Sequence, residues 1–417
     1  MSYFDLNTAL SWEDTAVRDS VHQFAREVVR PASRRLDVMP AAEVIAAGSP
    51  LYDVLRHAYE LGYHKALFPE SVGGPGFSAL QKSIFFEEMA WGSFGIGLAI
   101  GIAALPFYFA LATGSQKLIE QFVIPFLNCT DGSIRGCWGI TEPNHGSDVM
   151  NTSDELLSQP GVKGDVRGRI EGGEVVISGQ KSAWVSCGSI ATHCMLHLQL
   201  DESAGLAGSG MAFVPLDLPG VSRGAPLEKL GQRDLNQGEI FFDEVRIPAE
   251  WVLLGPDMYQ MGMGLVLATA NMLMGICATG LARASFDESF QWARERVQGG
   301  KALIGHDSMK QRLFAMFSRV ETSRALARAV AGCNFDNRAP AVEYSVACKF
   351  TNTELCYQNA HDAVQIFGGY GLAREYLPEK LFRDARACLI EDGCNEMLAK
   401  KGGYFLAETY PRLNVIS

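Results

Sequence analysis

The sequence predicts an α+β protein of three consecutive domains, helical, β and helical in that order. Apolar residues recur at helical spacing in the first third of the chain and again after residue 258, whereas the apolar runs between residues 134 and 248 are short and separated by Gly, Asp and Asn. A length of 417 residues also exceeds what a single core usually organises. We therefore divide the chain into an all-α domain (1–133), a β domain (134–250) and a helical bundle (251–417).

The first domain carries three stretches of helical periodicity, at Trp12–Val29, Leu51–Gly62 and Phe85–Trp91. The uncharged segment 93–115 is long enough to span a membrane, but it contains four glycines and Pro106 and has no basic flank. We predict a buried pair of helices broken at Pro106, and no integral membrane segment.

The middle domain contains the segment GRIEGGEVVISGQK (168–181), which predicts a β-hairpin that turns at Gly172-Gly173. Further strands are expected at 195–200, 211–216 and 239–245, so this domain is expected to be a small β-barrel or sandwich. In the last domain, an apolar stripe through Leu313 and the segment 343–367 predict long helices of a bundle.

Composition excludes several classes of function. The net charge of -11 and the lack of a basic run argue against nucleic-acid binding. The 10 cysteines form no CxxC pair and no Cys/His cluster, so we predict no metal site and reduced thiols in a cytoplasmic protein. Gly95-Ile96-Gly97 follows no strand, and neither a Walker lysine nor a Gly-x-Ser-x-Gly elbow is present.

Five segments then carry a resemblance. They are WGITEPNHGSD (138–148), GQKSAWVSCG (179–188), LGQRDLNQGEIFFDEVRIP (230–248), RERVQGGKALIGHDSMKQRL (294–313) and QIFGGYGLAREYLPEKLFRDAR (365–386). In order and spacing the chain resembles the acyl-CoA dehydrogenase family over nearly its whole length. The resemblance implies an N-terminal helical domain, a middle β-barrel domain and a C-terminal four-helix bundle. It also implies an FAD-dependent enzyme that removes two hydrogens from an acyl thioester.

The resemblance assigns residues to the cofactor and the substrate. Asp392 stands at the position of the catalytic base, which would take the α-proton while the β-hydride passes to flavin N5. The expected FAD contacts are Trp138, Ile140, Thr141, Ser147, Trp184, Ser186, Arg296, His306, Gln365, Gly368, Gly369 and Cys394. The expected substrate contacts are Ser147, Gly393, Gly101 and Asn271.

Three departures from the family pattern bear on the chemistry. The usual base is Glu, and an Asp carboxylate sits about one C–C bond (~1.5 Å) further back, a displacement that can lower a rate by ~100-fold. Glu391 is the rival base. Some members of the family carry their base on the first helix of the bundle instead, but here the stretch between Asp257 and Asp287 contains no acidic residue. Ala268 and Asn271 replace residues that grip pantetheine in relatives, which favours a weaker or different hold on CoA. Gly97 and Gly101 suggest a roomy acyl pocket.

The predicted function is therefore the dehydrogenation of an acyl-CoA, with three alternatives. These are an acyl-carrier-protein thioester dehydrogenase, a flavin oxidase of the nitroalkane-oxidase type, whose base is Asp, and a non-catalytic subunit. The resemblance further implies that an electron-transfer flavoprotein or a similar acceptor reoxidises the flavin. It also implies a homotetramer or homodimer, because Arg296 would reach the FAD of a neighbouring subunit.

Overall fold

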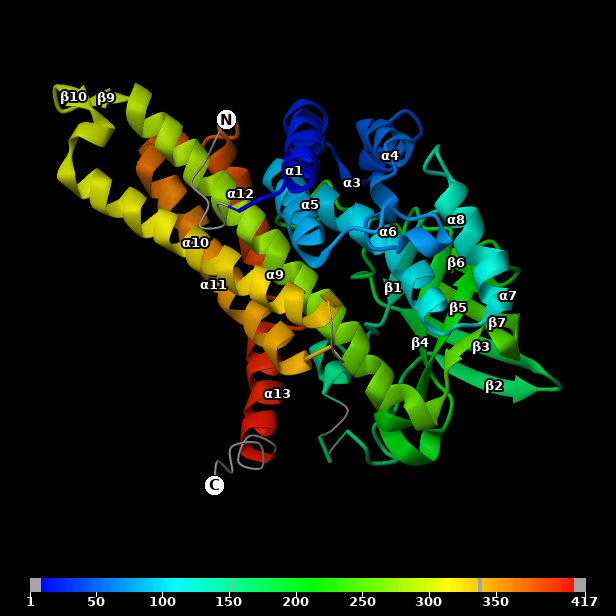
Figure 1. Cartoon of the computed structure of the whole chain (residues 1–417). Helices are drawn as coiled ribbons and strands as arrows, with labels where there is room; N and C mark the ends of the chain where they lie inside the picture. Colours follow the sequence, from blue (N-terminus) through cyan, green and yellow to red (C-terminus); the bar gives the residue numbers. More distant parts are fainter. Residues whose placement is uncertain (1–8, 152–153, 156, 337–339, 409–417) are drawn as a thin grey trace.

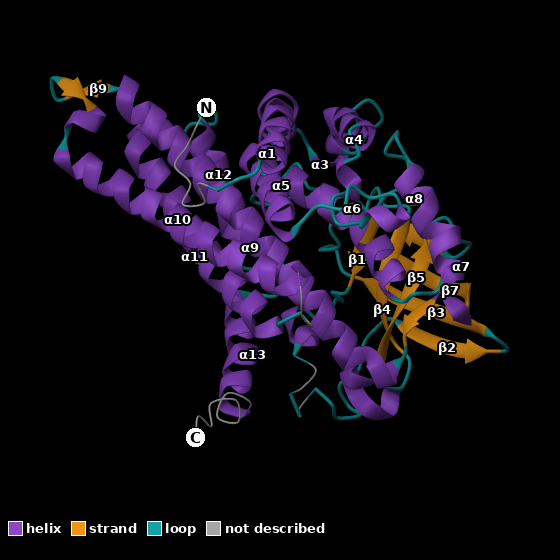
Figure 2. Ribbon diagram, in the orientation of Figure 1, coloured by secondary structure: helices purple, strands orange, loops and turns teal. Residues whose placement is uncertain are grey.

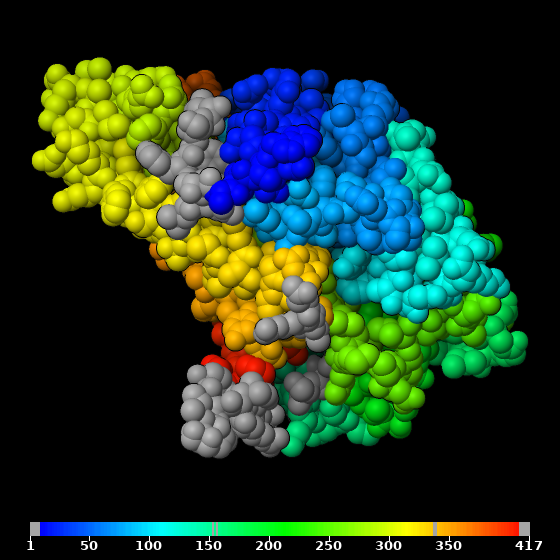
Figure 3. Space-filling view, viewed as in Figure 1, coloured from blue at the N-terminus to red at the C-terminus, as the bar shows by residue number. Residues whose placement is uncertain are grey.

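The computed structural model describes residues 9–151, 154–155, 157–336 and 340–408. The predicted order of a helical domain, a β domain and a helical domain is confirmed (Figure 1). The N-terminal helices lie between the long C-terminal helices and the sheet, and the space-filling view shows them covering both neighbours (Figure 3). All ten cysteines are free, as expected for reduced thiols.

The N-terminal domain begins with a capped helix. Ser11 and Asp14 form a reciprocal capping box at the start of α1 (Trp12–Phe24), which continues through a π-helical turn, Ala25–Val29, into α2 (Arg30–Leu36). The remaining helices are α3 (Ala41–Val44), α4 (Pro50–Glu60), α5 (Ala79–Gly92), α6 (Phe94–Ala112), α7 (Gln116–Leu118) and α8 (Ile124–Asn128).

Helix α6 corrects one prediction, because it runs through Pro106 as a single helix and is not broken there. The ring of Pro106 packs against the backbone of Gly136, where a Cβ would lie 2.5 Å from the proline Cδ. This tertiary contact holds a proline that sequence rules place at a helix end. Two helices, α6 and α9 (Pro256–Glu295), are apolar and long enough to cross a membrane, but 67% and 94% of their most apolar windows are buried inside the protein.

The middle domain is built on one mixed sheet with the strand order β6-β7-β3-β2-β4-β5-β8, and β1 pairs with β4 outside this path. The predicted hairpin is present as the antiparallel pair β2–β3, and β1 runs parallel to β4. The strands are β1 (Gly136–Gly139), β2 (Arg167–Glu171), β3 (Glu174–Lys181), β4 (His193–Gln199), β5 (Ser209–Pro215), β6 (Val221–Arg223), β7 (Ile240–Pro248) and β8 (Val252–Leu254).

The C-terminal domain is organised by α9, which has 40 residues and is therefore roughly 60 Å long (Figure 2). It packs against α5 of the first domain as well as against the other bundle helices. The further elements are β9 (Val297–Gln298), β10 (Lys301–Ala302), α10 (Asp307–Asp336), α11 (Val342–Phe367), α12 (Leu377–Cys388) and α13 (Asn395–Glu408).

A buried ion-pair cluster joins the first and last domains. Arg283 of α9 donates to Glu87 of α5 at 2.8 Å and also pairs with Glu88, while Arg324 of α10 donates to Glu87 at 2.9 Å. His22 of α1 lies 2.8 Å from Glu88. Burial alone would raise the pKa of Glu88, but Arg283 and His22 outweigh it and lower that pKa to about 2.

Candidate active site

A cavity of about 540 Å³ lies where the three domains meet. Its walls come from α6, from β1 and the loop after it, from the segments around residues 184–186 and 229–231, and from the turn that follows α12. Eight of the predicted site residues line it: Trp138, Ile140, Thr141, Ser147, Trp184, Ser186, Asp392 and Gly393. The structure thus brings together residues that are up to 255 positions apart in the sequence.

The strand β1 reaches the cavity because its glycines allow close packing. A Cβ on Gly139 would lie 2.8 Å from the sulfur of Cys194 on the neighbouring strand β4. Beyond the strand, Thr141 is fixed by Ser182, whose backbone N–H donates to the Thr141 carbonyl and whose hydroxyl donates to Thr141 Oγ1, both at 2.9 Å. Because the Thr141 hydroxyl accepts this bond, its own proton remains available to the cavity.

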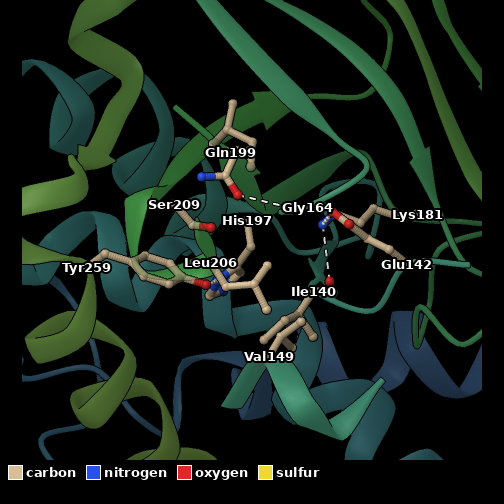
Figure 4. A pocket seen from close by; sticks show the side chains of 11 residues that line it. Ile140, Glu142, Val149, Gly164, Lys181, His197, Gln199, Leu206, Ser209 and Tyr259 are labelled. Carbon is tan, nitrogen blue, oxygen red and sulfur yellow. Dashed lines mark hydrogen bonds and ion pairs between the residues drawn. The ribbon is translucent and has the colours of Figure 1, made fainter. Parts of the chain in front are cut away.

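A buried ion pair supports the same loop from below (Figure 4). The ammonium of Lys181 donates to Glu142 at 2.5 Å and to the carbonyl of Ile140 at 3.1 Å. Glu142 in turn accepts the backbone N–H of Val166 at 3.2 Å and that of Asp165. An ion pair this deeply buried is stable only when its other hydrogen-bonding positions are also filled, as they are here. The loop that carries Ile140 and Thr141 is therefore held rigidly.

A second wall contains two residues that the sequence analysis did not single out. Gln237 donates to the hydroxyl of Ser186 at 3.1 Å and to the carbonyl of Trp184 at 3.4 Å, and it accepts from Lys229 at 2.7 Å. The side chain of Trp184 itself is 58% exposed. Gln237 and Lys229 both lie in or next to the motif 230–248, which had been recognised as a unit without any of its polar residues being assigned a role.

The turn that carries Asp392 is held by hydrogen bonds from α9, from α11 and from the loop after β1. Asp392 has a left-handed backbone with φ 51°, followed by Gly393 with φ 92°. Asn271 of α9 donates to the carbonyl of Asp392 at 3.1 Å, and Lys349 of α11 donates to that of Gly393 at 2.8 Å. Such bonds from outside are needed because a side-chain-bearing residue seldom keeps a left-handed conformation on its own.

The predicted residue Cys394 completes this turn, because its backbone N–H donates to Ser147 Oγ at 2.9 Å. Ser147 therefore links the flavin-type loop directly to the turn of Asp392. Cys394 and Asn271 do not line the cavity among the described residues; Cys394 acts through its backbone N–H, and Asn271 through its side-chain amide, which donates to a backbone carbonyl. Lys349 was missed by the sequence analysis; the available signal was one cation among apolar residues within the segment 343–367.

Burial raises the pKa of both carboxyl groups that open onto the cavity. Burial raises the pKa of Asp392 to about 6, and Lys349 only partly opposes this rise. Burial also raises the pKa of Glu391 to about 7 against the effect of Lys229 and a 2.8 Å hydrogen bond from Gln232. Burial lowers the pKa of Lys349 to about 8. A carboxyl with a pKa near neutrality is suited to accept a proton from carbon.

The prediction of a roomy pocket floor at Gly97 and Gly101 is wrong. A Cβ on Gly101 would lie 3.3 Å from the ring of Phe86, and one on Gly97 would lie 3.3 Å from the backbone nitrogen of Ala90. These glycines therefore serve the close packing of α6 against α5, and the space beside Gly101 is filled by an aromatic ring. On this helix it is Ile102 that lines the cavity.

A second cavity of about 640 Å³ lies at the far end of α9. It contains the predicted residues Arg296, Gln365, Gly368 and Gly369, together with Trp292 and Tyr370. The guanidinium of Arg296 lies 5.2 Å from the centre of the Tyr370 ring, and no atom lies within 4 Å of a Cβ built on either glycine. His306 is nearby, 2.9 Å from the carbonyl of Gln298, but does not line this cavity among the described residues.

The chain matches models for all three domains of one family. The N-terminal domain model of acyl-CoA dehydrogenase matches residues 11–129, the middle domain model 137–245 and the C-terminal domain model 262–403. Cyclohexane-1-carbonyl-CoA dehydrogenase of Geobacter metallireducens is 30% identical over 93% of this chain and 95% of its own. A probable acyl-CoA dehydrogenase of Bacillus subtilis, YngJ, is 27% identical over 94% and 97%.

Solved structures show the same fold. Nitroalkane oxidase, crystallised with 1-nitrooctane, superposes with a TM-score of 0.86 at 22% identity, covering 97% of this chain and 98% of its own. A glutaryl-CoA dehydrogenase of Mycobacterium smegmatis in complex with FADH2 superposes with a TM-score of 0.80 at 21% identity, covering 98% and 97%. Fold, cavity and sequence together define an oxidoreductase of the flavin-dependent type. The chain belongs to the acyl-CoA dehydrogenase family.

Proposed function

We propose that this protein catalyses the FAD-dependent α,β-dehydrogenation of an acyl thioester, with Asp392 as the base. The observation that carries the proposal is the placement of Asp392. Its carboxyl, with a pKa raised to about 6, opens onto the same cavity as Thr141, Trp138 and Trp184. Removal of an α-proton next to a carbonyl requires one partly desolvated carboxylate, and this turn supplies it.

The residues of the first cavity fit an isoalloxazine ring. Trp138 and Trp184 offer flat apolar surfaces, while Thr141 and Ser186 offer hydroxyl groups at the cavity wall. A cavity of about 540 Å³ with few polar groups is typical of sites for small molecules and cofactors. When bound, FAD supplies a two-electron acceptor for the hydride that leaves the β-carbon.

The protein itself would orient the thioester and take the proton. The backbone N–H of Asp392 would polarise the thioester carbonyl, which acidifies the α-carbon, and the Asp392 carboxylate would accept the α-proton. The hydroxyl of Ser147 accepts from Cys394, so its proton is left to donate to a pantetheine carbonyl. Lys349 and Asn271 would keep the Asp392 turn in place throughout.

The second cavity supports sharing of FAD between subunits. It lies roughly 37 Å along α9 from Asn271, which contacts the Asp392 turn. Arg296 would bind a pyrophosphate there, and the open space at Gly368 and Gly369 would accept the adenosine half of a neighbour's cofactor. Val297 and Leu372, on segments that frame this cavity, are 63% and 74% exposed and would be covered in a homotetramer or homodimer.

Anaerobic titration of the FAD-loaded protein tests the proposal. A panel of acyl-CoA and acyl-carrier-protein thioesters should include at least one that bleaches the flavin absorbance band. The comparison of the two carriers also decides whether the substrate is a CoA or a carrier-protein thioester. No bleaching by any thioester, combined with bleaching by a nitroalkane and rapid reoxidation by O₂, would favour the oxidase alternative, which an Asp base also fits.

A further inference from the structure

A chain of hydrogen bonds runs away from the cavity behind the indole of Trp138. The indole N–H of Trp138 on β1 donates to His197 Nε2 on β4 at 2.7 Å, and His197 Nδ1 lies 2.9 Å from the hydroxyl of Tyr259 on α9. All three residues are buried, with Trp138 6%, His197 3% and Tyr259 2% exposed. Figure 4 shows the His197 ring and the Tyr259 hydroxyl facing each other to the left of Ile140.

The indole N–H of Trp138 fixes which atom donates and which accepts in each of these hydrogen bonds. An indole N–H can only donate, so His197 Nε2 must accept and carries no proton. Burial and the neighbouring Lys181 lower the pKa of His197 well below its usual value, which keeps the ring neutral. Its one proton is therefore on Nδ1, which donates to the Tyr259 oxygen. This leaves His197 with a single tautomer and no alternative role for Nε2.

The strand itself gives the indole little lateral support. β1 is the short segment Gly136-Cys137-Trp138-Gly139, in which a glycine lies directly after Trp138 and another lies two residues before it. Trp138 also lines the cavity, so its indole forms part of the cavity wall. The bond to His197 on β4, which Tyr259 of α9 contacts in turn, restrains the indole. Its loss would leave a buried N–H without an acceptor.

We propose that His197 is a positioning residue that fixes the indole of Trp138 as a wall of the cofactor cavity. The proposal rests on the proposed function, because it assigns the cavity to FAD. His197 does not reach the cavity among the described residues, so it acts through Trp138. Tyr259 holds the tautomer that makes His197 an acceptor.

A double-mutant cycle on the FAD-binding protein tests this role. The apo protein is titrated with FAD, and the dissociation constant is read from flavin fluorescence for wild type, His197→Leu, Trp138→Phe and the double variant. His197→Leu should weaken FAD binding about tenfold, the size expected for one lost buried hydrogen bond. In the Trp138→Phe background, the same substitution should change affinity by less than about twofold.

Two milder variants separate positioning from packing. His197→Gln keeps an acceptor near the Nε2 position and should bind FAD within about threefold of wild type, and Tyr259→Phe should fall between Gln and Leu. In the ¹⁵N-tryptophan-labelled apo protein, slow hydrogen exchange of one indole should be retained in His197→Gln and lost in His197→Leu. These variants keep the proposal testable if His197→Leu does not fold, which its thermal unfolding would reveal.

Three outcomes would overturn the proposal. They are unchanged FAD affinity in His197→Leu, an equal loss of affinity with and without the Trp138 indole, and a failure of His197→Gln to restore binding. The last two would mean that His197 acts only as core packing. A wild-type protein that does not bind FAD would overturn the proposed function and this inference together, whereas loss of coupling in an FAD-binding protein overturns this inference alone.

Discussion

Two pairs of adjacent acidic residues, Glu87-Glu88 and Glu391-Asp392, are both enclosed by the fold and differ in what surrounds them. Burial raises the pKa of Glu87, but Arg324 and Arg283 outweigh it and bring that pKa below its usual value. Around Asp392, the opposing cation is Lys349, whose ammonium is already bonded to the Gly393 carbonyl, and burial dominates. The same sequence feature is a structural ion pair in one place and a pair of carboxyl groups with raised pKa values in the other, because distant helices supply guanidinium groups only to the first.

The largest expected effect is on turnover, at Asp392. Asp392→Asn should keep the fold, since Asn also tolerates a left-handed backbone, and should lower flavin bleaching by a suitable thioester by ~10²–10⁴-fold. Stopped-flow absorbance under anaerobic conditions measures this. Glu391→Gln is the matched control and should stay within about tenfold of wild type. The reverse ranking of the two variants would make Glu391 the base.

The next effect is on stability, at the other pair. Glu87→Gln leaves Arg283 and Arg324 without a full counter-charge in a buried site, so the free energy of unfolding should fall by roughly 3–5 kcal/mol. Urea unfolding followed by circular dichroism measures the change. Glu171→Gln, at an exposed ion pair on β2, is the control and should leave stability almost unchanged. Equal losses of stability in Glu87→Gln and Glu171→Gln would mean that the buried ion pairs of Glu87 stabilise the fold no more than a surface pair does.

The pH dependence of stability should have opposite signs at the two pairs. The pKa of Glu88 is lowered from 4.5 to about 2, so its stabilising contribution is complete above pH 4.5 and is lost as the pH falls towards 2. The pKa of Asp392 is raised from 3.8 to about 6, so its carboxylate costs stability above pH 6 and nothing below 3.8. The stability of Asp392→Asn relative to wild type should therefore be greater at about pH 8 than at about pH 4. Urea unfolding at both pH values checks this sign, and no difference between them would refute it.

The smallest expected effect is a shift in the pKa of Asp392. Lys349 opposes the rise in the pKa of Asp392, so Lys349→Met should move the pH midpoint of flavin bleaching above about 6. Pre-steady-state bleaching across the pH range measures the midpoint. Lys400→Met, at a surface pair with Asp154, should leave it in place. A midpoint that is unchanged or lower in Lys349→Met would show that Lys349 does not lower the pKa of Asp392.

Much of the architecture was predictable because it depends on local pattern. Helical periodicity, the Gly172-Gly173 turn and the position of the long helices are set by residues close in sequence. The break expected at Pro106 failed because a strand glycine from another domain packs on the proline ring. The pocket floor expected at Gly101 failed for a similar reason, since Phe86 of α5 occupies the space.

The cavity residues were found through motifs, whereas their supporting contacts were not. Thr141 and Trp184 stand in recognisable segments, but Lys349, His197 and Gln237 are polar residues whose partners lie 44 to 62 positions away. Sequence shows that such a residue is polar; only the fold shows what it faces. The raised pKa of Glu391 is likewise a property of the enclosed cavity and of no local pattern.

The left-handed backbone at Asp392 also limits which amino acids can occupy that position. Short acids and amides tolerate this conformation better than longer side chains, so the turn itself favours Asp over Glu. Lengthening the acid by one methylene would therefore meet a conformational barrier as well as a change of reach. While the bonds from Asn271 and Lys349 hold the turn, a Glu at this position would have to adopt the same left-handed backbone.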